Sequence, residues 1–138
     1  MNSEIKVPVS PGELIDKITI LRIKSQRMND PQKLHNVRLE LEALQGTWSG
    51  SAFAGIDIEA DVHALMTVNE RLWVIEDDIR DKERAQAFDA EFIRLARAVY
   101  VENDERAAIK RRINAKLGSA LVEEKSYREY RTGSPRPP

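Results

Sequence analysis

Apolar residues recur at three- and four-residue steps along most of the chain, which is the periodicity of amphipathic helices. The first such stretch, residues 10–28, opens with Ser10, Pro11 and Glu13. Ser10 and Glu13 have the spacing of a capping box, and proline suits a first helical position because its missing N–H needs no partner there. A helix is therefore predicted to begin at Pro11. Because branched apolar residues surround much of its cylinder, we expect it to be packed on several sides.

A second and a third helix follow. Asn29-Asp30-Pro31 places a cap residue before a proline that starts a helix, and so short a link predicts that the first two helices form an antiparallel hairpin. Residues 46–55 are rich in glycine and serine and predict a loop. A third helix is expected from about Ile58 to about Glu83, and it is distinctly acidic.

The fourth helix is predicted to begin after Asp89, a candidate N-cap. A polar patch around Asn103 interrupts its apolar residues, but their register continues beyond the patch. This continuity favours one long helix over a break. Gly118 is a typical residue just past a helix end.

Two short segments outside the helices need partners. Residues 4–9 alternate polar and apolar side chains until Pro8, as in an edge strand or an extended arm. We expect this arm and residues 120–127 to lie together. The fold class is therefore mainly α: an antiparallel helical hairpin packed on two long helices, with short extended N-terminal and C-terminal segments. Residues 1–130 form a single domain, and residues 131–138 have the composition of a disordered tail.

Composition narrows the classes of function. The 138 residues include no cysteine, which excludes disulfides, thiol nucleophiles and Cys-ligated zinc. The chain has neither a cationic leader with an apolar segment nor an apolar run of about 20 residues, so we expect a cytoplasmic protein without a membrane span. A formal net charge of −1 and a short basic segment make nucleic acid an unexpected partner.

Three groups of polar residues are candidate sites, and each has a structural alternative. The first, in the first helix, holds Glu13, Asp16 and Lys17, with Lys24 further along. Asp16 lies close enough to the apolar side to need a partner, so it is either part of a site or half of an internal ion pair.

The second group is a stripe on the third helix: Asn69, Trp73, Glu76, Asp77 and Arg80. It could form one wall of a polar pocket, or Asn69 could set the helix register with Trp73 in the core. The third group, Asn103, Arg106, Lys110 and Asn114, shares one face of the fourth helix. It could bind an anion or simply complement the acidic third helix.

Common catalytic constellations are missing from the sequence. His35 and His63 have no ligand-like partner nearby, and no phosphate-binding glycine loop is present. Glu13-x-x-Asp16 matches one half of the paired acids that hold magnesium in helical nucleotide pyrophosphohydrolases. We therefore expect no cofactor and no metal, and the residues do not decide whether the protein is an enzyme.

Four segments together resemble a bacterial family of small uncharacterised proteins. They are Val-Pro-Val-Ser-Pro-Gly-Glu-Leu-Ile-Asp-Lys-Ile-Thr-Ile-Leu at 7–21, Val-Asn-Glu-Arg-Leu-Trp-Val-Ile-Glu-Asp-Asp-Ile-Arg at 68–80, Asn-Asp-Glu-Arg-Ala-Ala-Ile-Lys-Arg-Arg-Ile-Asn at 103–114 and Glu-Glu-Lys-Ser-Tyr at 123–127. The resemblance implies no reaction, but it implies a context near glycosyltransferases and surface polysaccharides. Its motifs coincide with the three polar groups and add Glu124, Lys125 and Tyr127 as candidate ligand-binding residues.

The first helix is also similar to that of helical chorismate mutases, through Ile15-Asp16, Ile18, Ile20-Leu21, Lys24 and Arg27. That family places an arginine upstream of the Ile-Asp pair, where this chain has Ser-Pro-Gly-Glu. The departure removes a cation that would bind substrate.

Two functional hypotheses remain. The first is a non-catalytic binding or assembly module, self-associating or with a protein partner, linked to cell-envelope polysaccharide pathways. The second is a small helical enzyme acting on an anionic metabolite, like a chorismate mutase or a nucleotide pyrophosphohydrolase. Lys17, Lys24, Arg80, Arg106 and Lys110 are then the candidate contacts to the anion.

Overall fold

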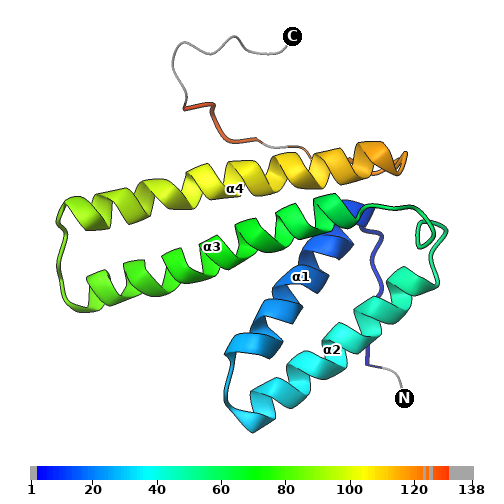
Figure 1. The fold of residues 1–138 in the computed structure, drawn as a ribbon, viewed down its shortest axis with the longest axis horizontal. Coiled ribbons are helices and arrows are strands. Elements are labelled where there is room, and N and C mark those ends of the chain that lie inside the picture. Colours follow the sequence, from blue (N-terminus) through cyan, green and yellow to red (C-terminus); the bar gives the residue numbers. More distant parts are fainter. Residues whose placement is uncertain (1–2, 123, 125, 131–138) are drawn as a thin grey trace.

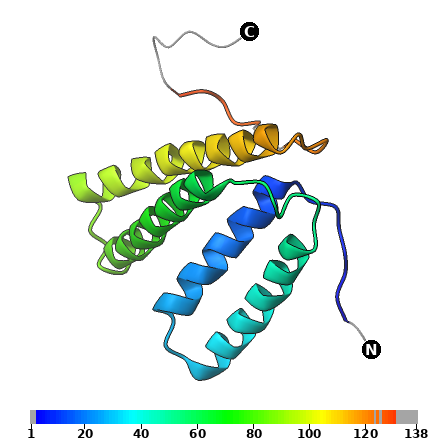
Figure 2. The same cartoon turned by 45° about the vertical axis from the view of Figure 1, so that its right-hand side comes forward.

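A computed structural model describes residues 3–122, 124 and 126–130, which form four helices and contain no strand. The helices are α1 (Pro11–Arg27), α2 (Pro31–Ser49), α3 (Glu59–Arg84) and α4 (Ala90–Lys116). They pair as two antiparallel hairpins, α1 with α2 and α3 with α4, which diverge from a shared corner (Figures 1 and 2). The mainly α fold class is therefore confirmed.

Helix α1 is central to the packing. It lies against α2, α3 and α4, whereas α2 lies closely against α1 alone among the described helices. The core forms around the first half of α1 and joins side chains from α3 and α4. Its buried apolar residues are Leu14, Ile15, Ile18, Ile58, Leu65, Val68, Ile109, Ile113 and Leu117. The expectation that the first helix is packed on several sides is confirmed.

Local capping signals place the starts of α1, α2 and α4, and the end of α4, where the sequence predicts them. The Ser10 hydroxyl accepts a hydrogen bond from the Glu13 N–H at 3.2 Å, and the Asp30 carboxylate accepts from the first turn of α2. Asp89 caps α4, accepting from the Phe92 N–H at 3.0 Å. Gly118 takes a positive φ of 65° directly after the C-cap of α4, a conformation that costs glycine little. Helix α4 is continuous through Asn103, as the apolar register indicates.

The predicted loop over residues 46–55 begins later than expected. Helix α2 passes through Gly46 and ends at Ser49, with Gly50 as its C-cap. The extra turn keeps Trp48 on the core side of the helix, where its ring stacks with Phe53 at a centroid distance of 6.4 Å. The packing of this large aromatic offsets the cost of one glycine inside a helix, about 1 kcal/mol.

The N-terminal arm was expected to lie with residues 120–127. For the residues of these two segments that the structure describes, this expectation is wrong. The arm leaves α1 on the side of α2, while the C-terminal segment runs along α4 (Figures 1 and 2). Ile5 is 89% exposed and Leu121 is 47% exposed. The Gly118 and Ser119 N–H groups donate to the carbonyls of Ala115 and Asn114 at the end of α4, and this turn sends the C-terminal segment back along α4, away from the arm. The predicted tail, residues 131–138, lies outside the described residues.

Within the described residues, no helix is long and apolar enough to cross a membrane.

A buried charged cluster beside an open cleft

Asp16 is the centre of the candidate site, and it is fully buried. Its carboxylate accepts a hydrogen bond from the Asn69 Nδ2 of α3 at 2.9 Å. It also receives two hydrogen bonds from the guanidinium of Arg106 on α4, one of them from Nε at 2.9 Å. Paired parallel bonds between arginine and a carboxylate are among the strongest in proteins. The expectation that Asp16 needs a partner is therefore met by contacts from two other helices.

A second ion pair lies next to the first. The ammonium group of Lys110 donates to Glu13 Oε2 at 2.6 Å and stands 3.6 Å from Asp16 Oδ2. The side chain of Lys110 is only 6% exposed. Glu13 therefore directs its carboxylate to α4 rather than completing the expected capping box, and Lys17 joins it only at the periphery, at 3.9 Å.

Backbone contact between α1 and α4 sets the spacing of these side chains. The Gly12 N–H, one of the first-turn donors that lack a partner within the helix, donates to Asn114 Oδ1 at 2.7 Å. A Cβ atom at Gly12 would lie 2.5 Å from the carbonyl oxygen of Lys110. Because Gly12 has no side chain, α4 can approach closely enough for the side chain of Asn114 to accept a hydrogen bond from the first turn of α1.

The structure joins members of all three predicted polar groups into one cluster, here called the charged cluster: Glu13, Asp16, Asn69, Arg106 and Lys110. Glu13 and Asp16 are three positions apart on α1, and Arg106 and Lys110 are four apart on α4, so each pair lies on one face of its helix. Two acids face two bases, and their formal charges balance.

Part of the second predicted group lies elsewhere. Glu76 and Arg80 form an ion pair with each other on the surface of α3, and the side chain of Arg80 is 73% exposed. Arg80 lies eleven residues beyond Asn69, which corresponds to about 16 Å along a helix. Trp73 is half-buried. The cluster therefore takes Asn69 from that stripe and leaves the rest outside.

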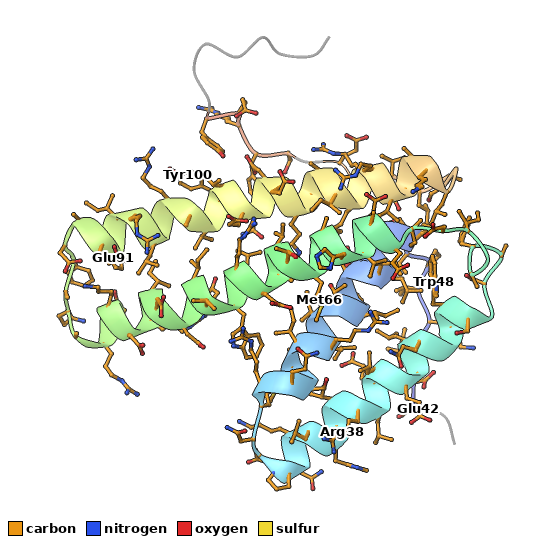
Figure 3. The ribbon with its side chains drawn as sticks, viewed as in Figure 1. Arg38, Glu42, Trp48, Met66, Glu91 and Tyr100 are labelled. Carbon is orange, nitrogen blue, oxygen red and sulfur yellow. The ribbon has the colours of Figure 1, made fainter. Side chains whose placement is uncertain are left out.

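A cleft of about 490 Å³ opens beside the charged cluster, between α4 and the C-terminal segment. Arg106 and Lys110 line the cleft together with Asn103, so three of the predicted residues lie on one wall. Their position alone does not test their role. The opposite side carries Glu124, Ser126 and Tyr127. Figure 3 shows Tyr100 on the face of α4 that points toward this segment, and its ring lies 4.7 Å from that of Tyr130. Lys125 lies outside the described residues.

Sequence reasoning missed three contributions. The Thr19 hydroxyl accepts from Asn69 Nδ2 at 2.9 Å and donates to the Asp16 carbonyl, so it orients the amide. Gly12 was not predicted to contact Asn114. A separate ion pair joins Asp61 to Arg112 at 2.7 Å. The i to i+3 spacing of Asp16 and Thr19 on the apolar side of α1 was the one available signal; the others depend on contacts between helices.

The chemistry of the charged cluster is that of an internal electrostatic contact between helices. Within residues 3–122, 124 and 126–130, no three histidine, aspartate or glutamate side chains are grouped as metal ligands would be. The Asn114 Nδ2 group is buried without a hydrogen-bond partner in the described structure. Both cations of the cluster also face the cleft.

These features define an all-α protein of two diverging hairpins, joined at a buried charged cluster. The chain belongs to the family of unknown function DUF6165, which matches residues 5–137. No curated protein and no solved structure matches it.

Proposed function

We propose that this protein is a non-catalytic binding module that holds a short segment of a protein partner in the cleft between α4 and the C-terminal segment. The observation that carries the proposal is the pairing of an open cleft with a charge-balanced cluster behind it. The balance of charge in the cluster supports an anchoring role. Asp16 and Glu13 already pair with Arg106 and Lys110, the two cations that also line the cleft, and so fix the position of this wall. Asp16, fully buried, has no exposure to a bound molecule.

The lining of the cleft suits a polypeptide segment. It combines the bases Arg106, Lys110 and Arg111 with the acids Asp104 and Glu124, so it offers both signs of charge. Tyrosine and arginine are enriched at the centres of protein interfaces, since they combine apolar contact area with hydrogen bonding. Tyr127, which lines the cleft and is 83% exposed, would lose a large exposed aromatic surface under a bound segment.

Photo-crosslinking tests this proposal directly. Tyr127 is replaced by p-benzoylphenylalanine in the full chain, and the same substitution at Arg80, exposed on α3 and outside the cleft, is the matched control. We expect a defined protein adduct from position 127 only, and its loss when Arg111→Glu reverses one charge of the cleft. Equal adducts from both positions, or an adduct that ignores Arg111→Glu, would contradict a binding site in the cleft.

A second candidate function is an enzyme acting on a small anionic metabolite. The observation that favours it is that Arg106 and Lys110 line the cleft beside Asn103. A thermal-shift screen against sugar nucleotides, divalent metals and shikimate-pathway acids separates the two candidates. A ligand at about 100 times its dissociation constant adds about 2.7 kcal/mol of stability. A gain that Asn103→Ala abolishes supports the enzyme, and no gain across the panel speaks against it.

The cellular setting is a proposal of the same kind. A bacterial protein linked to cell-envelope polysaccharide pathways is supported by the family resemblance alone, and a cytoplasmic setting is supported by the absence of an apolar run of about 20 residues from the sequence. The sugar nucleotides of the panel are its biochemical test, and the identity of a crosslinked partner is its cellular one.

A further inference from the structure

A second cavity, of about 510 Å³, lies between α1, α2 and the segment that leads into α3. Its floor is apolar and includes Ile15, Ile18, Trp48 and Val62. Figure 3 shows Trp48 at the end of α2 that adjoins this segment. This cavity, here called the hairpin groove, is distinct from the cleft beside α4, since the two share no lining residue.

The N-terminal arm, residues 3–9, carries an apolar face without a surface to cover it. Ile5 is 89% exposed and Val7 is 67% exposed, and with Val9 they lie on one face of an extended segment. The arm contributes no residue to the hairpin groove. Figure 2 shows it standing clear of α2.

Two prolines keep the arm extended. Pro8 and Pro11 disfavour helical conformations at Val7 and Ser10, the residues that precede them. Ser10 has the extended values φ −69° and ψ 155°. At about 3.3 Å per residue, the seven residues of the arm reach about 20 Å from α1. The arm is therefore held outward, where another molecule can meet it.

We propose that the arm of a second copy of this chain occupies the hairpin groove, and that two copies exchange arms in a symmetric dimer. The apolar face of the arm matches the apolar floor of the groove. One charge of the arm also has complements in the groove: Lys6 lies on the opposite face of the arm, and the exposed acids Asp57 and Glu59 line the groove. A two-fold arrangement uses both arms and both grooves at once.

Sedimentation velocity over a wide concentration range tests the exchange. Wild-type protein should dimerise, and Ile5→Asp should raise the dimer dissociation constant at least about 10-fold, because the change occurs twice in a symmetric interface. Leu121→Asp, which alters an exposed apolar residue outside the groove, is the control and should dimerise like the wild type. Because Ile5 is solvated in the single chain, its variant should keep the wild-type melting temperature at low concentration.

A charge exchange tests the register of the arm. Lys6→Glu and Glu59→Lys should each weaken the dimer, and the double variant should recover it. Trp48 fluorescence, in a Trp73→Phe background, should shift to shorter wavelength as the dimer forms.

Three results would overturn the exchange. The first is a protein that stays monomeric at every concentration. The second is a dimer whose dissociation constant does not change with Ile5→Asp. The third is a Trp48 emission spectrum that is the same at every concentration but moves to longer wavelength in Ile5→Asp. The last result would place the arm in the groove of its own chain.

Discussion

Replacing Asp16 with asparagine tests whether the charged cluster holds the two hairpins together. The substitution keeps the shape of the side chain but removes the charge that Arg106 and Lys110 face. Asparagine also introduces two N–H donors where the carboxylate accepted hydrogen bonds from Asn69 and Arg106. We expect a clear loss of stability with little change in helix content.

The structure sets the magnitude. Removing one partner of a buried ion pair costs about 3–5 kcal/mol. The lower end applies here, because the Arg106 side chain is 29% exposed and can recover some hydration, and Lys110 keeps its bond to Glu13. A loss of about 3 kcal/mol is a large share of the roughly 5–15 kcal/mol that stabilises an ordinary domain. For a chain of this length it lowers the melting temperature by roughly 10 °C.

Urea unfolding followed by far-ultraviolet circular dichroism measures the effect, with Arg80→Ala as the control. Arg80 belongs to an exposed pair, and such pairs contribute about 0–1 kcal/mol. A double-mutant cycle with Arg106→Leu should give a coupling energy of about 1–3 kcal/mol. A loss no larger than that of the control, or additive effects of Asp16→Asn and Arg106→Leu, would refute the anchoring role.

Two further predictions address the contact between α1 and α4 and the cap of α4. Gly12→Ala should lower the melting temperature, because the added Cβ would meet the Lys110 carbonyl oxygen at 2.5 Å; an unchanged melting temperature would show that the backbones can separate at no cost. A hydrogen bond from Lys82, and then one from the backbone N–H of Phe92, hold the pKa of Asp89 below its ordinary value. A depressed pKa stabilises the fold above the unfolded-state value of about 3.9, and this stability is lost as the pH falls through the folded-state pKa. The difference in melting temperature between wild type and Asp89→Ala should therefore shrink in acid, and a difference independent of pH would contradict this assignment.

The sequence by itself determined the four helices and the starting points of α1, α2 and α4. Ser10, Asp30 and Asp89 each accept from a backbone N–H two or three residues ahead, so the capping information lies within one turn. The short link before Pro31, residues 28–30, likewise set the first hairpin, because so few residues allow little besides an antiparallel return. The apolar stripe of the first helix predicted its central position for a related reason, since a helix apolar around much of its surface must be covered on several sides.

Helix–helix packing alone decided how the three polar groups meet. Asp16 indicated by its position that it needed a partner, but Arg106 lies 90 residues away and Asn69 lies 53 residues away. Helical periodicity shows which residues share a face of one helix. It does not show which faces of two helices pack together, or how far one helix is shifted along the other. The close approach of Gly12 to α4 sets the height of α1 against α4. The packing of α3 on α1 places Asn69 beside Asp16 and leaves Arg80 in solvent. The N-terminal arm shows the same limit. Its alternation indicated an extended segment, but only the tertiary structure showed that it leaves α1 on the side of α2, away from the C-terminal segment.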